Sequence, residues 1–228
     1  MISCAQSIPL GCSILQRLLA QRRSHISLSS PLAARRQVSG PLATGTGAAG
    51  AVTVVNCTFN APDWTLLTAY PWTDPADVRP GANQWILSGG TNVGTIQSNI
   101  LTSSALARYY IDSGTSDCTI TIKPNVQGAG VIFRHFDATN YWVFFPTNTL
   151  LRIQEIVGGV AQTRTSVPYV NAAYPQTYRV GLLGSSIACS IDEIVGAVTT
   201  FTSASLQLVT KHGVRLGTSL DDFRITVP

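Results

Sequence analysis

The chain has 228 residues, of which 45% are hydrophobic and 11% are charged. A chain of this length holds one sizeable domain with additional segments, and its hydrophobic content excludes disorder throughout. The charged share is well below the value of about 25% that is usual in soluble proteins. Gly, Ser, Thr and Val take the place of charged residues, a composition typical of sandwiches built from short strands and many turns.

The formal net charge of +4 comes from the first quarter of the chain. No acidic residue precedes Asp63, whereas the later part carries ten basic and eleven acidic residues. The basic segment is expected to be either a solvated tail or an arm that docks on the acidic surface of neighbouring subunits. No aromatic residue lies among its arginines, so nucleic acid is not the expected partner. These arginines are Arg17, Arg22, Arg23, Arg35 and Arg36.

Residues 1–51 are predicted to form this arm. Within it, residues 13–23 can form a short helix, because their apolar side chains fall on one side. Residues 39–51 are rich in Gly, Ala, Ser and Thr, which predicts a flexible linker. The segment also resembles a mitochondrial transit peptide, because it is rich in Arg, Ser and Leu and lacks acids. No run approaches the ~18 apolar residues needed to span a membrane.

The five cysteines are Cys4, Cys12, Cys57, Cys118 and Cys189. None forms a Cys-x-x-Cys pair, so a zinc site is not expected. Cys118 and Cys189 each alternate with isoleucines and are predicted to be small buried side chains. Their odd number does not indicate a disulfide scaffold, and whether Cys4 and Cys12 pair is left open.

From Val52 onward, short strand patterns follow one another and are separated by turn residues. The dipeptide Gly158-Gly159 predicts a tight hairpin, and residues 137–140 predict a second turn. No helical period of similar strength occurs after residue 51, so residues 52–228 are predicted to form an antiparallel sandwich or jelly roll. The predicted strands are 52–59, 64–69, 84–88, 94–101, 106–112, 117–123, 129–136, 140–146, 149–157, 160–166, 176–183, 186–192, 194–201 and 213–227, the last broken near Gly217.

Because side chains alternate along a strand, the pattern predicts which of them share a face. In the strand that begins near Gly130, Val131, Phe133 and His135 are expected on one face, and Ile132, Arg134 and Phe136 on the other. Two later strands are expected to direct Tyr178, Val180 and Leu182, and Phe223, Ile225 and Val227, into the core.

Several motifs, spread over residues 52–228, resemble the concanavalin A-like lectin/glucanase superfamily, and most of all its laminin-G-like modules from bacterial and phage surface proteins. The resemblance implies an all-β jelly-roll sandwich, in which Arg134, Asp137 and Asn140 build turns and strand pairs. It implies no single function, because this fold hosts lectins, hydrolases, adhesion modules and virion components. The motifs are Gly130-Val-Ile-Phe-Arg, Asp137-Ala-Thr-Asn-Tyr-Trp, Tyr178-Arg-Val, Ile191-Asp192 with Gly196, Gly213-Val-Arg-Leu-Gly and Asp221-Asp222-Phe-Arg-Ile.

Catalysis is not expected. Glucanases of this fold carry carboxylates on alternate residues of one strand, where one serves as acid and the other as nucleophile. This chain has only two glutamates, Glu155 and Glu193, and no two acids lie two positions apart. A pair of acids from different strands is the remaining alternative. Of the histidines, His135 is predicted to be a hydrogen-bonded structural residue and His212 to be exposed near a turn.

Two binding sites are considered. Calcium would need oxygen ligands from Asp112, Asp117, Asp137 or Asp221, but none lies in a recognisable calcium loop, so no cofactor is expected. Tyr70 and Trp72, with Asp74 nearby, could form an exposed platform for a sugar ring or a protein partner. The alternative is that Trp64 and Trp85 belong to the core and that Trp72 covers it.

The sequence therefore predicts a non-enzymatic structural or attachment protein. The basic arm would anchor a lectin-like head to neighbouring subunits of a homo-oligomeric assembly, such as a phage capsid decoration or tail. The expected location is a virion or an extracellular surface, in preference to a mitochondrion. The first alternative is a carbohydrate-binding module, and the second is a glycoside hydrolase.

Overall fold

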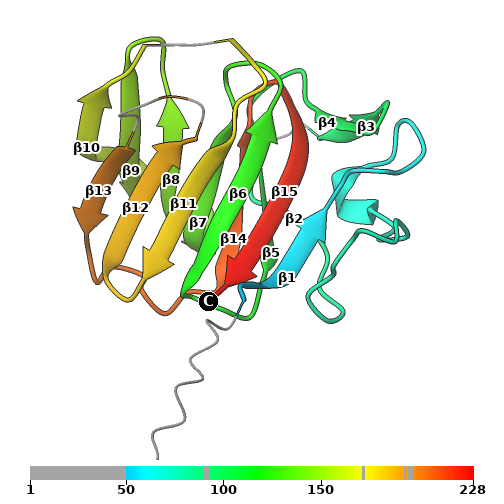
Figure 1. Ribbon diagram of the computed structural model, residues 1–228, viewed down its shortest axis with the longest axis horizontal. Helices are drawn as coiled ribbons and strands as arrows, with labels where there is room; N and C mark the ends of the chain where they lie inside the picture. The colour runs from blue at the N-terminus through cyan, green and yellow to red at the C-terminus, as the bar shows by residue number, and fades with distance from the viewer. Residues whose placement is uncertain (1–49, 90–92, 171–172, 193, 195–197) are drawn as a thin grey trace, which may run out of the picture. The chain divides into compact units, whose positions relative to one another are not determined.

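Strands make up nearly all of the regular structure in a computed structural model of the chain, which describes residues 50–89, 93–170, 173–192, 194 and 198–228 (Figure 1). The first strand begins at Val52, where the head domain is expected to begin. All but the last two residues of the expected arm lie outside the described ranges. Its predicted helix, its five arginines, Cys4 and Cys12 are therefore not described.

Two antiparallel sheets face each other, and Figure 1 shows the first in front of the second. The first has eight strands: β13 (Val198–Thr202), β12 (Ser186–Ile191), β11 (Tyr178–Leu183), β6 (Cys118–Pro124), β15 (Ser219–Val227), β4 (Ile100–Thr102) and β3 (Thr95–Gln97), in that order, with β1 (Val52–Cys57) also paired to β15. The second has seven: β10 (Val160–Pro168), β9 (Leu150–Val157), β8 (Asn140–Pro146), β7 (Gly130–Asp137), β14 (Lys211–Leu216), β5 (Ala107–Asp112) and β2 (Ile86–Leu87).

The hydrophobic core lies between the sheets and follows the alternation of the strands. In β11, Tyr178, Val180 and Leu182 are buried, as predicted. In β15, Phe223 and Ile225 are buried, and Val227 is partly buried and packs against the same core. The chain passes from one sheet to the other after β1, β2, β4, β5, β6, β10, β13 and β14. The all-β sandwich predicted from the sequence is confirmed.

Two of the predicted strands are wrong. Residues 64–69 form a bend that leads into a 3-10 turn, η1 (Leu67–Ala69), because Trp64 takes a φ of 69° that breaks an extended chain. Residues 94–101 do not run straight: they belong to a small hairpin, β3 and β4. Its turn residues Ser98 and Asn99 have φ values of 52° and 62°.

The predicted faces of β7 are correct only as far as Phe133. Arg134 has a φ of 50°, and the register with β8 shifts between Phe133 and Asp137. This bulge reverses the alternation, because one extra residue is inserted in the strand. Arg134 therefore points between the sheets and is fully buried. His135 points to the outside of the second sheet, where its ring stacks on Tyr110 at 4.2 Å.

The prediction that His212 is exposed is also wrong. This residue is the second of β14 and has no exposed surface. Its Nε2 lies 2.9 Å from the carbonyl oxygen of Thr115, and burial lowers the pKa of the imidazole to about 4. The predicted burial of Cys118 and Cys189 is confirmed, and both are free thiols.

Candidate functional site

The outer face of the second sheet carries a layer of rings. His135 stacks between Tyr110 and Tyr141, with centroid distances of 4.2 and 5.7 Å. Nε2 of His135 makes a short hydrogen bond of 2.5 Å with the hydroxyl of Ser88. Burial lowers the pKa of His135 to about 4, so its ring is neutral near pH 7. Below this layer, Tyr141 packs into a small apolar cluster with Ile132, Val143 and Ile156.

Two arginines are held against these rings. The Arg108 guanidinium lies 5.5 Å from the centre of the Tyr141 ring, and its Nη1 donates to the Tyr141 hydroxyl at 2.9 Å. The Arg215 guanidinium lies 4.7 Å from the centre of the Phe145 ring, and its Nη1 donates to the carbonyl of Gly128 at 3.1 Å. Cation–π contacts and hydrogen bonds therefore fix both guanidinium planes.

A third arginine completes the group. Arg152 in β9 lies directly opposite Phe145 in β8, and residues opposite each other in an antiparallel pair share a face. We call this surface the arginine–aromatic face. It is made up of Arg108, Tyr110, His135, Tyr141, Phe145, Arg152 and Arg215.

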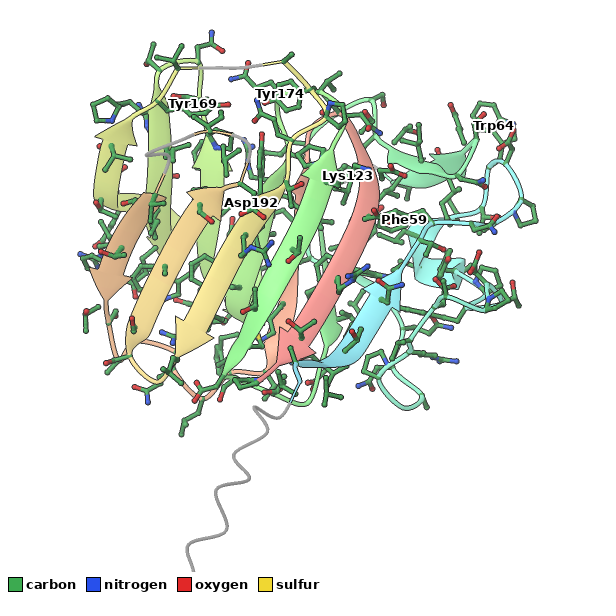
Figure 2. The ribbon with its side chains drawn as sticks, viewed as in Figure 1. Phe59, Trp64, Lys123, Tyr169, Tyr174 and Asp192 are labelled. Carbon is green, nitrogen blue, oxygen red and sulfur yellow. The ribbon has the colours of Figure 1, made fainter. Side chains whose placement is uncertain are left out.

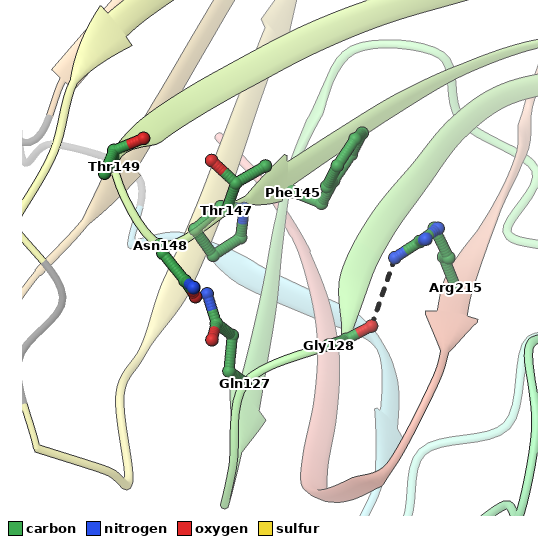
Figure 3. A pocket seen from close by; sticks show the side chains of 8 residues that line it. Gln127, Gly128, Phe145, Thr147, Asn148, Thr149 and Arg215 are labelled. Carbon is green, nitrogen blue, oxygen red and sulfur yellow. Dashed lines mark hydrogen bonds between the residues drawn. The ribbon is translucent and has the colours of Figure 1, made fainter.

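An open hollow of about 480 Å³ lies at one end of this face (Figure 3). Phe145 and Arg215 line it from the sheet. The loop before β7 and the turn between β8 and β9 supply the other walls, with polar uncharged side chains. Amides, hydroxyls, a guanidinium and a ring are groups that can bind a polar ligand by several directed hydrogen bonds. The lining residues from the loop and turn are Gln127, Gly128, Pro146, Thr147, Asn148 and Thr149.

The predicted pair of Tyr70 and Trp72 does not form an exposed platform. Tyr70 is fully buried, and its hydroxyl donates to Asp77 at 2.7 Å. Trp72 is half-buried, packs edge-on against Tyr70, and donates from Nε1 to Gln84 at 2.7 Å. The two rings contact each other, but they cover the core. Their role in binding a partner remains a prediction.

Asp74 has a local structural contact. Its carboxylate accepts a hydrogen bond of 2.5 Å from the side-chain amide of Asn60 and one of 2.7 Å from the backbone N–H of Ala76. These bonds lower its pKa, so the carboxylate stays charged. Asp74 thus holds together the loop that precedes β2.

The exposed tryptophan of this region is Trp64. The alternative considered for the sequence, in which Trp64 and Trp85 are core residues, is right only for Trp85, which is 2% exposed. Trp64 is 72% exposed, and Figure 2 shows it on the loop beside β3 and β4. Its backbone N–H donates to the carbonyl of Ile96 at 2.7 Å.

The aspartates considered for calcium have hydrogen-bond partners within the protein. Asp112 accepts from the hydroxyl of Thr210, and Asp117 accepts from the backbone N–H of Gly184. In the described part of the chain, no three side chains of His, Cys, Asp or Glu gather where they could hold a metal ion.

The other two calcium candidates are also engaged. Asp221 lies 3.6 Å from the Lys123 ammonium. Asp137 accepts hydrogen bonds from Asn140 and Thr139, which lower its pKa to about 2. The turn-building role that the family resemblance implies for Asp137 and Asn140 agrees with these bonds.

Glu155, a candidate for a catalytic pair, is locked into an ion pair. Its carboxylate accepts from Arg164 at 2.5 Å and from the Ser205 hydroxyl at 2.5 Å, and the residue is 5% exposed. Glu193, the other glutamate, lies outside the described residues.

Sequence reasoning missed the arginine–aromatic face, although part of its signal was present. Arg108 and Tyr110 alternate with the buried Tyr109, and Tyr141 and Phe145 alternate with buried residues, so each pair could be placed on one face of its strand. The pairing of β14 with β5, which brings Arg215 beside Arg108, joins segments about 100 residues apart and leaves no local pattern.

No protein-family model and no curated protein matches this chain. Solved structures do match. The carbohydrate-binding module CBM66 from Bacillus subtilis has 15% identity and a TM-score of 0.45, over 62% of this chain and 91% of its own. The CBM2 module of the evolved Dit of Lactobacillus casei BL23 phage J-1 has 11% identity and a TM-score of 0.46, over 77% and 95%.

A third match is SCLam, a non-specific endo-β-1,3(4)-glucanase, with 10% identity and a TM-score of 0.46, over 78% of this chain and 92% of its own. The structures matched are concanavalin A-like jelly-roll sandwiches, the fold that the sequence motifs resemble. The similarities concern the fold alone. Among the described residues, no helix has the length and hydrophobicity to cross a membrane.

Proposed function

We propose that the head domain, residues 52–228, is a non-catalytic saccharide-binding module and that the arginine–aromatic face is its binding surface. The observation that carries this proposal is the hollow at the end of the face. There the side chains of Gln127, Asn148 and Arg215 are among those that line the open space. Saccharides present many hydroxyls, and such a set of donors and acceptors can pair with several of them at once.

The face supports binding without chemistry. Glu155 is held by Arg164 and Ser205, so it is not free to act as an acid or a nucleophile. His135 has a buried ring with a low pKa and stacks between two tyrosines, which makes it a structural group of the face. Both observations favour a binding module over a glycoside hydrolase.

The proposal includes the anchoring role predicted for the basic arm, residues 1–51. In this arrangement the arm attaches to neighbouring subunits of a virion or another extracellular assembly, and the head presents the binding face. Removal of residues 1–50 tests it. We expect the truncated chain to keep its saccharide binding and to lose its attachment to the particle. Attachment without the arm would contradict the anchoring role.

A glycan array probed with the full chain tests the saccharide-binding function. We expect a defined set of glycans to be retained, and we expect the double variant Asn148→Ala/Thr149→Ala to bind them at least about tenfold more weakly, because lost hydrogen bonds are worth roughly 1 kcal/mol each. Both side chains are exposed in the β8–β9 turn.

The matched control is Thr200→Ala/Thr202→Ala, which truncates two exposed side chains on β13 of the other sheet. Failure of the full chain to bind any glycan, or equal binding by both double variants, would contradict the proposed function.

A further inference from the structure

Resting on the proposed function, we infer that the saccharide bound at the arginine–aromatic face is acidic and carries carboxylate or sulfate groups. Two like charges lie side by side on this face. Arg108 in β5 and Arg215 in β14 lie directly opposite each other in the register of the second sheet. Like charges in this position repel each other, so the sheet is less stable than it would be with neutral side chains.

Among the described residues, no carboxylate on this face neutralises the two arginines. The ion pairs formed among the described residues are Lys123 with Asp221, Arg164 with Glu155, and Arg179 with Asp192. None of them includes Arg108, Arg152 or Arg215.

Two aspartates lie near the margins of the second sheet. Asp112 ends β5, lies opposite Lys211, and is bonded to Thr210. Asp137 is held in the β7–β8 turn by Thr139 and Asn140. Within the described part of the chain, the centre of the face is therefore positively charged.

The two arginines also have hydrogen-bond donors left over. A guanidinium has five N–H donors in a fixed plane. Arg108 uses two of its nitrogens, for the carbonyl of Ser88 and the hydroxyl of Tyr141, and Arg215 uses Nη1 for Gly128. Their planes are fixed by the rings that they contact, so little conformational entropy is lost when an anion binds.

Arg215 is also partly buried. Its surroundings lower the pKa of the guanidinium, first through burial and then through the charge of Arg108. A partly buried cation without a carboxylate partner is unfavourable, and an anion bound between Arg215 and Arg108 would relieve both effects. Carboxylate and sulfate oxygens match the spacing of guanidinium donors.

The rings favour an acidic saccharide over single-stranded nucleic acid. Nucleic acids bind such surfaces by stacking bases on free aromatic faces. Here His135 and Tyr141 are 2% and 5% exposed, and the Phe145 ring is covered by Arg215. The face therefore presents guanidinium groups and amides, with few ring surfaces open for stacking.

The experiment measures binding of the full chain to polygalacturonate, to its fully methyl-esterified form, to carrageenan, to agarose and to a dT20 oligonucleotide. Polygalacturonate and its ester differ only in the free carboxylates, and carrageenan with agarose provides a comparison for sulfate. We expect at least about tenfold tighter binding to one of the acidic polymers than to its neutral counterpart, with a loss of affinity at high salt. The acidic polymer that binds more tightly shows whether the recognised group is a carboxylate or a sulfate.

The variant Arg108→Gln/Arg215→Gln is expected to remove this preference. Its control is Arg22→Gln/Arg23→Gln, which removes the same charge from the arm and should bind as the unchanged chain does. Equal binding to an acidic polymer and its neutral counterpart would overturn the inference while leaving the proposed function intact. Binding to none of the polysaccharides would overturn the inference, and the glycan array then decides the proposed function separately. Loss of acidic binding in the arm variant alone, or tighter binding to dT20 that depends on Arg108 and Arg215, would also overturn the inference.

Discussion

The backbone N–H of Arg134 donates a hydrogen bond of 3.3 Å to Nδ1 of His212, between the two sheets. This bond fixes the tautomer of the histidine, because Nδ1 must be the acceptor and Nε2 must carry the proton. Nε2 then donates to the carbonyl of Thr115 at 2.9 Å. A second proton, on Nδ1 of His212, would point at the backbone N–H of Arg134, which is itself a donor. The site has no exposed surface, so the folded protein resists protonation of this histidine.

The first prediction concerns pH. The pKa values of His212 and His135 are both lowered to about 4 by burial, whereas an unfolded histidine titrates near 6.5. The unfolded chain therefore gains protons first as the pH falls. The stability that the neutral histidines contribute is complete above pH 6.5 and is lost between 6.5 and 4. We expect the free energy of unfolding to fall by roughly 3 kcal/mol for each histidine in this window.

Urea unfolding between pH 7.5 and 4 measures this loss. In His212→Gln, the total change over the window should be about half that of the unchanged chain. Aspartates with lowered pKa values, such as Asp137 at about 2, contribute only at lower pH. A pH profile of stability that is the same in His212→Gln and in the unchanged chain would contradict the lowered pKa of His212.

The second prediction concerns the side chain of Arg134. Its guanidinium donates to the carbonyls of Ser203, at 3.1 Å, and of Gly184. Arg134→Met keeps an unbranched apolar chain, lacks the guanidinium and leaves both carbonyls without this donor. We expect a loss of roughly 2–4 kcal/mol in the free energy of unfolding, because unsatisfied buried groups are costly. Arg79→Met, in an exposed loop, is the control and should change stability by less than about 0.5 kcal/mol.

The third prediction concerns a glycine with no room for a side chain. A Cβ at Gly213 would lie 1.9 Å from the carbonyl oxygen of Tyr109 and 2.6 Å from Cα of Tyr110, both in the backbone of β5. Gly213→Ala should separate β14 from β5 and lower the melting temperature by at least about 10 °C, because a strain of several kcal/mol corresponds to such a shift in a domain of this size. It should also disturb the register of Arg215 and Arg108.

Gly181→Ala provides the comparison in the other sheet. There a Cβ would meet its nearest atom, the carbonyl oxygen of Ala188, at 3.9 Å, which is an ordinary contact. We expect little change in the melting temperature. Similar effects of the two substitutions would contradict the close approach of β14 and β5.

Local patterns in the sequence were sufficient to predict most strands but not their irregularities. The turn at residues 137–140 and the hairpin at Gly158-Gly159 were predicted correctly, because their residue types favour those conformations. Arg134, Ser98 and Asn99 adopt positive φ values that their residue types do not demand. Tertiary contacts hold Arg134 in place, and a single sequence carries no sign of them.

The candidate site was also predictable only in part, because it depends on contacts between distant segments. Alternation places Arg108 beside Tyr110, and Tyr141 beside Phe145, on the outer side of their own strands. Only the order of strands in the sheet brings these pairs together with Arg215, and that order was not predictable from spacing. The aromatic content near residues 64–85 directed attention to Tyr70 and Trp72 instead, because composition does not show which ring is buried.

The last prediction separates two tryptophans, Trp64 and Trp85, that one alternative drawn from the sequence placed in the core together. Trp85 is 2% exposed and packs edge-on against Phe223, with centroids 4.8 Å apart, whereas Trp64 is 72% exposed. Trp85→Ala should therefore lose roughly 3–5 kcal/mol in the free energy of unfolding, and Trp64→Ala less than about 0.5 kcal/mol. Urea unfolding measures both. Iodide should quench the fluorescence of the Trp85→Phe variant more strongly than that of Trp64→Phe, because only the former keeps the exposed indole. A large loss of stability in Trp64→Ala would place its ring in the core and contradict the bend at residues 64–69.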